Sequence, residues 1–128
     1  LGSTMRLLLD THTLLWWLSD PPLETTARDH IADHGNPVFV SAATAWEITV
    51  KQALGKLTAP DDLESVVASG GFEALPISFA HGLTAGRLPP HHRDPFDRML
   101  NAQAQHEGLT IVTRDSVFAA YDVATVAA

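Results

Sequence analysis

The stretch at residues 6–12, Arg6-Leu7-Leu8-Leu9-Asp10-Thr11-His12, is the part of the sequence that best indicates the fold. Its apolar run is short and ends abruptly at an aspartate, which predicts a buried strand followed by a turn. Similar short apolar runs at 38–40 and 109–112 each precede a helical pattern. Buried strands that alternate with helices predict an α/β fold with a mainly parallel sheet.

Outward from these strands, apolar spacing and the Gly, Pro and Ser positions predict the remaining elements. Ser41 and Ser78 are expected to cap helices, and Gly108 to end the helix that begins at Asp94-Pro95. The expected strands cover 6–9, 38–40, 72–77, 109–112 and 123–126. The expected helices cover 14–18, 23–33, 42–54, 60–69, a segment after Ser78, 95–107 and 116–120. We therefore predict a sheet of about five strands flanked by helices.

Composition narrows the class of protein. The chain has 128 residues, of which 45% are hydrophobic, and this is enough for one domain with a continuous core. We expect residues 1–4 to be an expression-tag remnant and residues 5–128 to form that domain. Because there is no cysteine, disulfides, thiolate metal sites and cysteine nucleophiles are excluded, and a cytoplasmic location is expected. The longest apolar stretches, about five residues, are too short to span a membrane.

The formal net charge of −7 at first argues against a polyanionic partner such as nucleic acid. However, six of the eight Lys and Arg residues lie between positions 51 and 114, among the acidic residues that interest us most. A divalent cation held by those acids would also neutralise part of the charge. The acidic composition therefore does not exclude a nucleic-acid substrate.

Four acidic residues are expected at the carboxyl ends of the strands, where α/β sheets bind ligands. Asp10 and Asp115 follow strands, Glu47 lies in the second turn of helix 42–54, and Asp97 lies in the first turn of the helix before Gly108. Four carboxylates repel one another unless a cation neutralises them, and their oxygens suit Mg²⁺ or Mn²⁺. Because such a metal can activate water and stabilise charge on a phosphoryl oxygen, the arrangement predicts phosphodiester hydrolysis.

The order and spacing of four motifs between residues 5 and 126 resemble the PIN-domain ribonucleases, in particular the VapC toxins of type II VapBC toxin–antitoxin systems. The motifs are Leu7-Leu8-Leu9-Asp10-Thr11-His12, Ser41 with Trp46-Glu47, His92-Arg93-Asp94-Pro95-Phe96-Asp97-Arg98-Met99-Leu100, and Leu109-Thr110-Ile111-Val112-Thr113-Arg114-Asp115. The resemblance implies a PIN-like three-layer sandwich, Mg²⁺- or Mn²⁺-dependent endoribonuclease activity, a homodimer and a VapB-type antitoxin as partner. Transfer RNA, ribosomal RNA and messenger RNA all stay open as substrates.

Residue roles follow from the same resemblance. It implies a catalytic and metal-binding quartet made of Asp10, Glu47, Asp97 and Asp115. Thr113 would line the same pocket, and Asp94 and Arg98 are candidate accessory residues. The chain departs from the family at Asn101, where many relatives have an aliphatic residue. We expect this difference to alter local packing and to touch none of the acids.

Helix chemistry separates the two neighbouring acids of the third motif. Pro95 is favoured at the first helical position, so Asp94 should be the N-cap. In a capping box the third helical residue is usually a glutamate or glutamine that reaches back to the N-cap. The Asp97 side chain is too short for this, so Asp97 is the expected metal ligand. Structural alternatives for the other acids are an Asx turn at Asp10, an exposed helix position for Glu47 and a helix cap at Asp115.

Histidines and tryptophans are assigned to the surface or to packing. The histidines that are expected at the surface because they lack metal-ligand spacing are His30, His34, His81 and His106. His91 and His92 lie in the loop 88–93 and are expected to be exposed, with a contact to substrate left open there and at His12. The tryptophans assigned to packing, in the core or at a dimer interface rather than against bases, are Trp16, Trp17 and Trp46.

Other classes of protein also cluster acids. A phosphoacceptor receiver module binds Mg²⁺ but needs an acceptor aspartate near mid-chain, and the segment 52–56 contains none. A haloacid-type phosphatase would need an aspartate two positions after Asp10, where this chain has His12. A non-catalytic interaction domain is the remaining alternative, and metal-dependent cleavage of RNA would exclude it.

Overall fold

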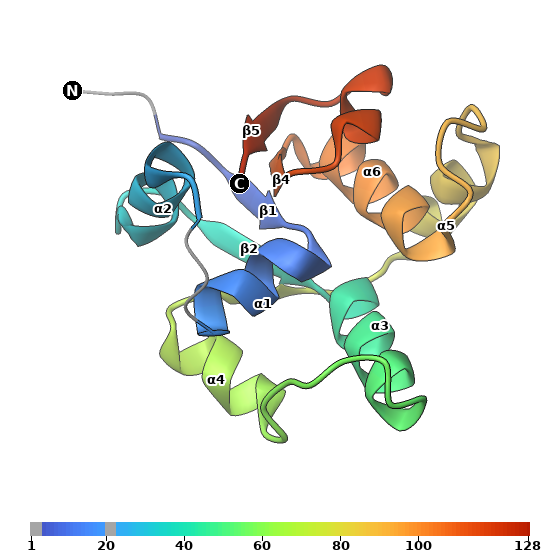
Figure 1. The fold of residues 1–128 in the computed structure, drawn as a ribbon. Helices are drawn as coiled ribbons and strands as arrows, with labels where there is room; N and C mark the ends of the chain where they lie inside the picture. Colours follow the sequence, from blue (N-terminus) through green and yellow to red (C-terminus); the bar gives the residue numbers. More distant parts are fainter. Residues whose placement is uncertain (1–3, 20–22) are drawn as a thin grey trace.

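A computed structural model describes residues 4–19 and 23–128 (Figure 1). Five strands form one sheet in the order β3-β2-β1-β4-β5, and every neighbouring pair is parallel. The strands are β1 (Leu7–Leu9), β2 (Val38–Ser41), β3 (Glu73–Leu75), β4 (Thr110–Thr113) and β5 (Thr125–Ala127). The predicted five-stranded parallel sheet is therefore confirmed, with β1 at its centre. The tag remnant expected at residues 1–4 lies outside the described residues apart from Thr4.

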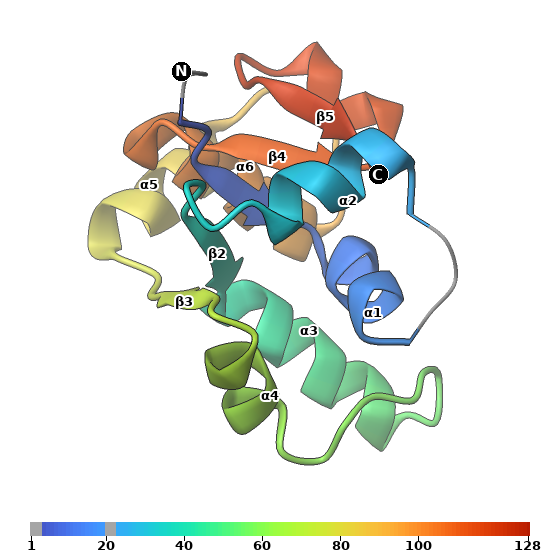
Figure 2. The same cartoon turned by 90° about the vertical axis from the view of Figure 1, so that its left-hand side faces the viewer.

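Helices cover both faces of the sheet and give three layers (Figures 1 and 2). They are α1 (Thr11–Ser19), α2 (Thr25–Ala32), α3 (Ala42–Ala53), α4 (Leu63–Ser69), α5 (Phe79–Arg87), α6 (Pro95–Glu107) and the 3-10 helix η1 (Ser116–Ala120). Successive side chains of a strand point to opposite faces. Leu7 and Leu9 accordingly pack in one core with residues of α1, α2 and α4, whereas Leu8 packs in the other with residues of α6 and η1. The predicted three-layer sandwich is confirmed.

Capping interactions fix several helix ends where the sequence predicts them. Ser41 Oγ accepts a hydrogen bond from Ala43 N at 2.9 Å at the start of α3. Ser78 Oγ accepts one from His81 N at 3.1 Å at the start of α5. Gly108 ends α6 with a φ of 65°, a left-handed conformation that glycine adopts at little cost.

Several elements begin or end at residues other than those expected, among them α1, α4, β3 and β5. Helix α1 begins at Thr11 rather than at 14, because the Asp10 carboxylate caps it by accepting a hydrogen bond from Thr13 N at 2.8 Å. The expected turn at 10–12 is therefore wrong. Strand β3 is limited to 73–75 and β5 to 125–127, since each lies at an edge and pairs with one neighbour only.

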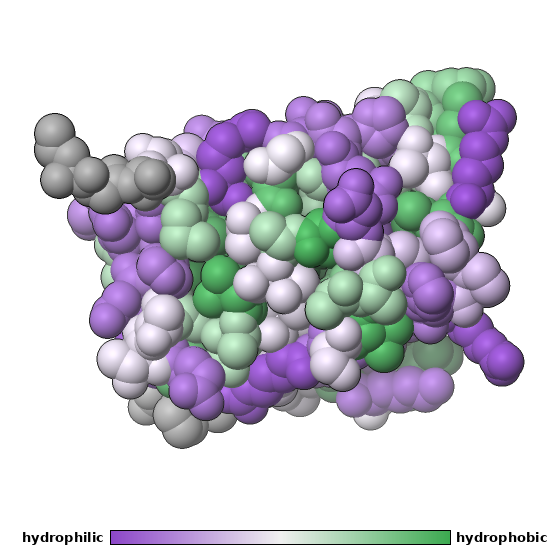
Figure 3. Space-filling view, turned by 90° about the horizontal axis from the view of Figure 1, so that it is seen from above, coloured by the Kyte–Doolittle hydropathy of each residue, from purple (hydrophilic) through white to green (hydrophobic). Residues whose placement is uncertain are grey.

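The surface carries apolar side chains mainly at two helices. Viewed from above, apolar and polar side chains are interspersed (Figure 3). The largest exposed apolar side chains lie on or just after α3 and on α5, where Trp46 is 58%, Leu54 62% and Phe79 84% exposed. Within the described residues, no helix has the length and apolar character needed to cross a membrane. The exposed side chains on α3 and α5 mark a candidate contact surface.

Candidate active site

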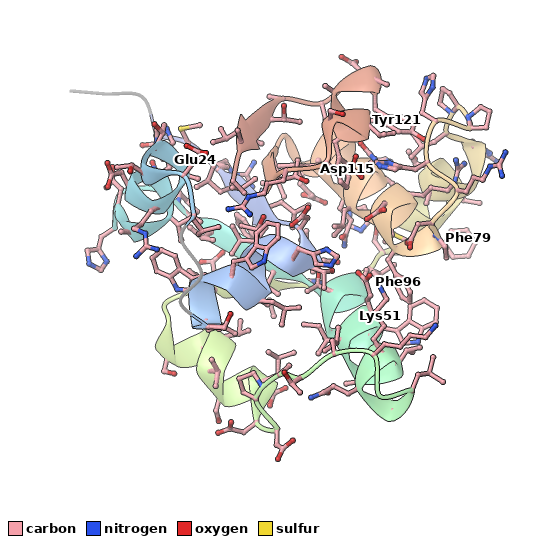
Figure 4. The ribbon with its side chains drawn as sticks, in the orientation of Figure 1. Glu24, Lys51, Phe79, Phe96, Asp115 and Tyr121 are labelled. Atoms are coloured by element: carbon pink, nitrogen blue, oxygen red, sulfur yellow. The ribbon has the colours of Figure 1, made fainter. Side chains whose placement is uncertain are left out.

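One pocket at the carboxyl edge of the sheet contains all four predicted acids. Its volume is about 440 Å³, room for a phosphate group and several waters. Side chains from α1, α3, α6 and the end of β4 point into it, with Lys51 and Asp115 contributed by α3 and by the residue after β4 (Figure 4). The residues that line it are Asp10, Thr11, His12, Trp16, Glu47, Lys51, Asp94, Asp97, Arg114 and Asp115. The topology thus brings residues more than 100 positions apart to one site.

Asp10 is held rigidly at the end of β1. Its side chain is buried, with 7% of its surface exposed. One carboxylate oxygen accepts from Thr13 N at 2.8 Å, and the other accepts from the hydroxyl of Thr113 at 2.5 Å. Asp10 is therefore both the cap of α1 and a member of the pocket, and Thr113 acts on the pocket through Asp10 rather than by lining it.

Glu47 is buried and forms an ion pair with Lys51, which lies one helical turn later. Its Oε1 accepts from Thr11 Oγ1 at 2.5 Å, and its Oε2 lies 2.6 Å from Lys51 Nζ. The hydrogen bond that Lys51 donates to Glu47 raises the pKa of Lys51 above its ordinary value, and the charges of Asp94 and Asp97 act in the same direction. The exposed helix position considered for Glu47 is therefore wrong, because only 4% of the residue is exposed.

Asp94 and Asp97 differ in the way that the helix start predicts. Asp94 Oδ1 accepts from Phe96 N at 2.8 Å and from Asp97 N at 3.2 Å, with Pro95 as the first helical residue. Burial raises the pKa of Asp97 to about 7, and repulsion from Asp94 adds to this shift. Asp97 therefore resists ionisation in the absence of a cation.

Asp115 is bound by a main-chain donor and by a histidine. Burial alone would raise the pKa of Asp115, but hydrogen bonds from Val117 N and from His92 hold it below its ordinary value. Val117 N donates to Oδ1 at 2.9 Å, and His92 Nε2 lies 3.0 Å from Oδ2. Asp115 therefore caps η1, as the sequence suggests, while it also faces the pocket.

His92 overturns the expectation that loop 88–93 exposes its histidines. Only 6% of His92 is exposed, because its ring packs against Phe118 and Tyr121. His81 is also buried, against the expectation of a surface position, since its ring accepts from Ser78 N and contacts Glu107. Helix and loop packing, which a local pattern does not reveal, buries both rings.

The other predicted residues fall into two groups. Trp16 and Trp17 pack against the core as expected. Trp46 is largely exposed, with 4.9 Å between its ring centroid and that of Phe96, so it is not a core residue and its place at a dimer interface stays a prediction. Arg98 does not line the pocket. Its guanidinium donates to the main-chain oxygens of Pro89, His92 and Leu88, so it holds the loop that carries His92.

Three residues that contact the acids are absent from the sequence-based set: Thr11, Lys51 and His92. The spacing of four between Glu47 and Lys51, which places them on one helix face, was the available signal for the lysine. Thr11 directly follows Asp10, but its contact with Glu47 depends on how α1 packs on α3. No local pattern distinguishes His92 from His91.

The chemistry of the donors fits a hard divalent cation. Carboxylate oxygens of four acids converge on the pocket, and the pKa of Asp97 is raised first by burial and then by the negative charges of neighbouring acids, which a cation would offset. Ligand atoms of His92, Asp97 and Asp115 also lie within 4.8 Å of one another. The residues present can therefore hold Mg²⁺ or Mn²⁺.

Replacing Lys51 with methionine is expected to lower the free energy of unfolding of the metal-free protein at neutral pH by about 1–3 kcal/mol. The reason is that the Glu47 carboxylate would stay buried without its cation. Lys56→Met is the matched control, because Lys56 is exposed and should change stability by less than about 0.5 kcal/mol. Urea denaturation measures both, and equal effects would contradict a stabilising role for the Glu47–Lys51 pair.

Comparison with known proteins gives a consistent result. A sequence model of the PIN domain family matches residues 7–124. Ribonuclease VapC22 of Mycobacterium tuberculosis is 28% identical over 116 residues, which cover 84% of this chain and 85% of that protein.

Solved structures resemble the fold over nearly the whole chain. The DNA-bound VapBC structure from Salmonella typhimurium has a TM-score of 0.69 at 19% identity, and covers 96% of this chain and 98% of that one. The structure of VapBC2 from Rickettsia felis bound to a promoter DNA fragment has a TM-score of 0.71 at 15% identity, and covers 95% and 98%. At these identities the two structures support the fold alone.

Proposed function

This chain belongs to the PIN domain family, and we propose that it is the ribonuclease toxin of a VapBC-type toxin–antitoxin pair, which hydrolyses RNA phosphodiester bonds with Mg²⁺ or Mn²⁺. One observation carries the proposal: the carboxylates of Asp10, Glu47, Asp97 and Asp115, from four different elements, line one pocket. The similarity to ribonuclease VapC22 supports the same substrate class. The strand order β3-β2-β1-β4-β5 differs from the 2-1-3-4-5 order of receiver modules, which disfavours that alternative.

In this proposal the four acids bind the metal, and neighbouring residues fix the orientation of the acids by hydrogen bonds. When bound, Mg²⁺ or Mn²⁺ lowers the pKa of water and offsets charge on a phosphoryl oxygen. Thr13 N and Thr113 fix both oxygens of Asp10, and Thr11 fixes Glu47, so these ligands are already oriented. Lys51 Nζ, which lines the same pocket, is the cation that can contact a non-bridging phosphate oxygen.

The rim of the pocket offers contacts for the rest of an RNA chain. The guanidinium of Arg114 lies 4.0 Å from the centroid of the Trp16 ring, and His12 lies beside that ring at 5.8 Å between centroids. His12 is exposed, and all three residues line the pocket. We assign Arg114 to phosphate and His12 to a base or phosphate of the substrate. Asp94, which caps α6, tunes Asp97 by its charge rather than by binding metal.

Two protein partners belong to the proposal. A VapB-type antitoxin would place a cationic side chain in the acidic pocket or an apolar segment beside it. A homodimer would bury the apolar surface around Trp46 and Phe79, next to the groove that Ala85, Phe96 and Met99 help to line. Co-purification with the product of the neighbouring gene and the mass of this chain alone by light scattering test the two partners. A monomer that retains no antitoxin would contradict both.

Cleavage of a structured RNA by the purified protein tests the activity. We expect cleavage with Mg²⁺ or Mn²⁺, its loss in EDTA and its recovery when metal is restored, because no other nucleophile or acid–base triad is found among the described pocket residues. Asp10→Asn, purified identically, controls for contaminating nucleases and should be inactive. Undiminished cleavage by the metal-free protein would refute the proposal.

A further inference from the structure

A chain of three polar contacts, one buried and two partly buried, leads away from the pocket behind Asp115. His92 Nε2 lies 3.0 Å from Asp115 Oδ2, and His92 Nδ1 lies 3.2 Å from Asn101 Nδ2. Asn101 Nδ2 also donates to the main-chain oxygen of Asp97 at 3.2 Å. Asn101 is fully buried and contacts the main-chain oxygen of Asp97 and, through His92, Asp115, so the expectation that its difference from relatives touches none of the acids is wrong.

The contacts of Asn101 determine which nitrogen of His92 carries the proton. The main-chain oxygen of Asp97 can only accept a hydrogen bond, so the group of Asn101 that faces it is the amide NH₂. The same NH₂ faces His92 Nδ1, which must therefore accept. A neutral imidazole then carries its proton on Nε2, the nitrogen that faces Asp115. The geometry consequently makes His92 a donor to Asp115 Oδ2.

The surroundings hold the His92 ring in this orientation. His92 N donates to the hydroxyl of Tyr121 at 2.6 Å. The ring stacks on Tyr121 with 5.5 Å between centroids and meets the edge of Phe118 at 4.5 Å. Arg98 fixes the main chain of the same residue by donating to the His92 carbonyl oxygen at 3.1 Å. The ring therefore cannot swing away from Asp115 without loss of packing on two aromatic side chains.

The side chain of Asn101 also has one unfavourable feature, a buried oxygen without a hydrogen bond to the part of the chain that the structure describes. Its Oδ1 is the one buried side-chain oxygen or nitrogen without a hydrogen-bond partner among the described residues. A buried acceptor without a partner is unfavourable, and an aliphatic side chain at this position would avoid the loss. The NH₂ group is thus the part of the Asn101 side chain that forms hydrogen bonds, with Asp97 O and with His92 Nδ1.

We propose that His92 is a positioning residue for the metal-binding carboxylate Asp115, and that Asn101 supports the required His92 tautomer from the other side of the ring by donating to Nδ1. The proposal rests on the proposed function, because it assigns Asp115 to the metal. Val117 N and His92 Nε2 each occupy one lone pair of Asp115, which lines the pocket and keeps its remaining lone pairs for a metal. His92 does not itself bind the metal, although its distance would allow it, because its Nε2 lone pair is taken by the proton.

The tautomer is tested directly on the metal-free protein. Proton–nitrogen NMR correlation through the His92 ring should show the Nε2–H tautomer in the wild-type chain. Asn101→Leu should fold with an undiminished melting temperature and keep the Nε2–H tautomer, because Asp115 still accepts from Nε2, but its Nδ1 resonance should shift, because the donor to Nδ1 is lost. An Nδ1–H tautomer in the wild-type protein would overturn the donation from His92 to Asp115, and an unchanged Nδ1 resonance in Asn101→Leu would overturn the role assigned to Asn101.

The effect on the metal is tested by Mn²⁺ binding, followed by electron paramagnetic resonance. His92→Phe keeps the aromatic packing and removes the donor, so Mn²⁺ affinity should fall by about 10- to 100-fold. His92→Gln can place an NH₂ where Nε2 lies and should recover most of that loss. Wild-type affinity in His92→Phe would overturn the proposal. Absence of Mn²⁺ binding by the wild-type protein would instead refute the proposed function, while the NMR result still decides whether His92 donates to Asp115.

Discussion

Replacing Asp97 with asparagine is expected to lower the rate of metal-dependent RNA cleavage by about three orders of magnitude and to raise the melting temperature of the metal-free protein above pH 7. The activity falls because a metal ligand is lost from a pocket in which a bound cation contributes most of the electrostatic stabilisation. The stability rises because burial and the charge of Asp94 raise the pKa of Asp97 to about 7. Above that pH the Asp97 carboxylate is ionised, and both its burial and the charge of Asp94 then destabilise the folded protein. The neutral amide of asparagine avoids this loss of stability.

Asp94→Ala is the matched control for Asp97→Asn. Asp94 accepts hydrogen bonds from Phe96 N and Asp97 N, so its loss should cost about 1 kcal/mol of stability. Appreciable cleavage should remain, because the metal ligands are intact. Thermal melting and RNA cleavage of both variants separate the two roles. An active Asp97→Asn beside a stable but inactive Asp94→Ala would show that the roles are reversed.

The fold and the placement of the four acids follow from short-range patterns. Three leucines that end at Asp10 predict the central strand, and Pro95 fixes the start of α6, which puts Asp97 in its first turn. In a parallel sheet the carboxyl ends of the strands lie at one edge, so acids after strands or in first helical turns converge there. The sequence alone is therefore enough to predict that residues 10, 47, 97 and 115 share one pocket.

The surroundings of those acids could not be predicted in the same way. His92 is buried because η1 and the residue after it, more than 20 positions later, place Phe118 and Tyr121 against its ring. Its neighbour His91 has the same local sequence context and is exposed. Trp46 has apolar neighbours in the sequence but lies on the outer face of α3, because the face opposite it carries Glu47 and Ile48 into the interior. Both outcomes depend on packing between elements rather than on local spacing.

The affinity for Mn²⁺ should depend steeply on pH up to about 7, because Asp97 must lose a proton before it can bind the metal. The raised pKa also sets the stability of the metal-free protein. Below the ordinary pKa of 3.8, Asp97 is protonated in the folded and the unfolded state, so its burial carries no penalty. As pH rises from there to about 7, the unfolded chain ionises first and stability declines, after which the loss stays constant.

A bound metal offsets the loss of stability that ionised Asp97 causes, but at low pH it must first displace the proton of that carboxyl group. Apparent Mn²⁺ affinity should therefore rise about tenfold for each pH unit that approaches 7 from below and level off above it. Asp115 adds no step in this range, because its pKa is lowered. The increase in melting temperature at a fixed Mn²⁺ concentration, measured from about pH 5.5 to about pH 8, reports the affinity. Asp94→Ala removes one cause of the raised pKa, so its curve should move to lower pH. An Mn²⁺ effect that is equal across this range, or a curve that Asp94→Ala leaves in place, would show that Asp97 is ionised throughout and that the pocket is less crowded with charge than its geometry indicates.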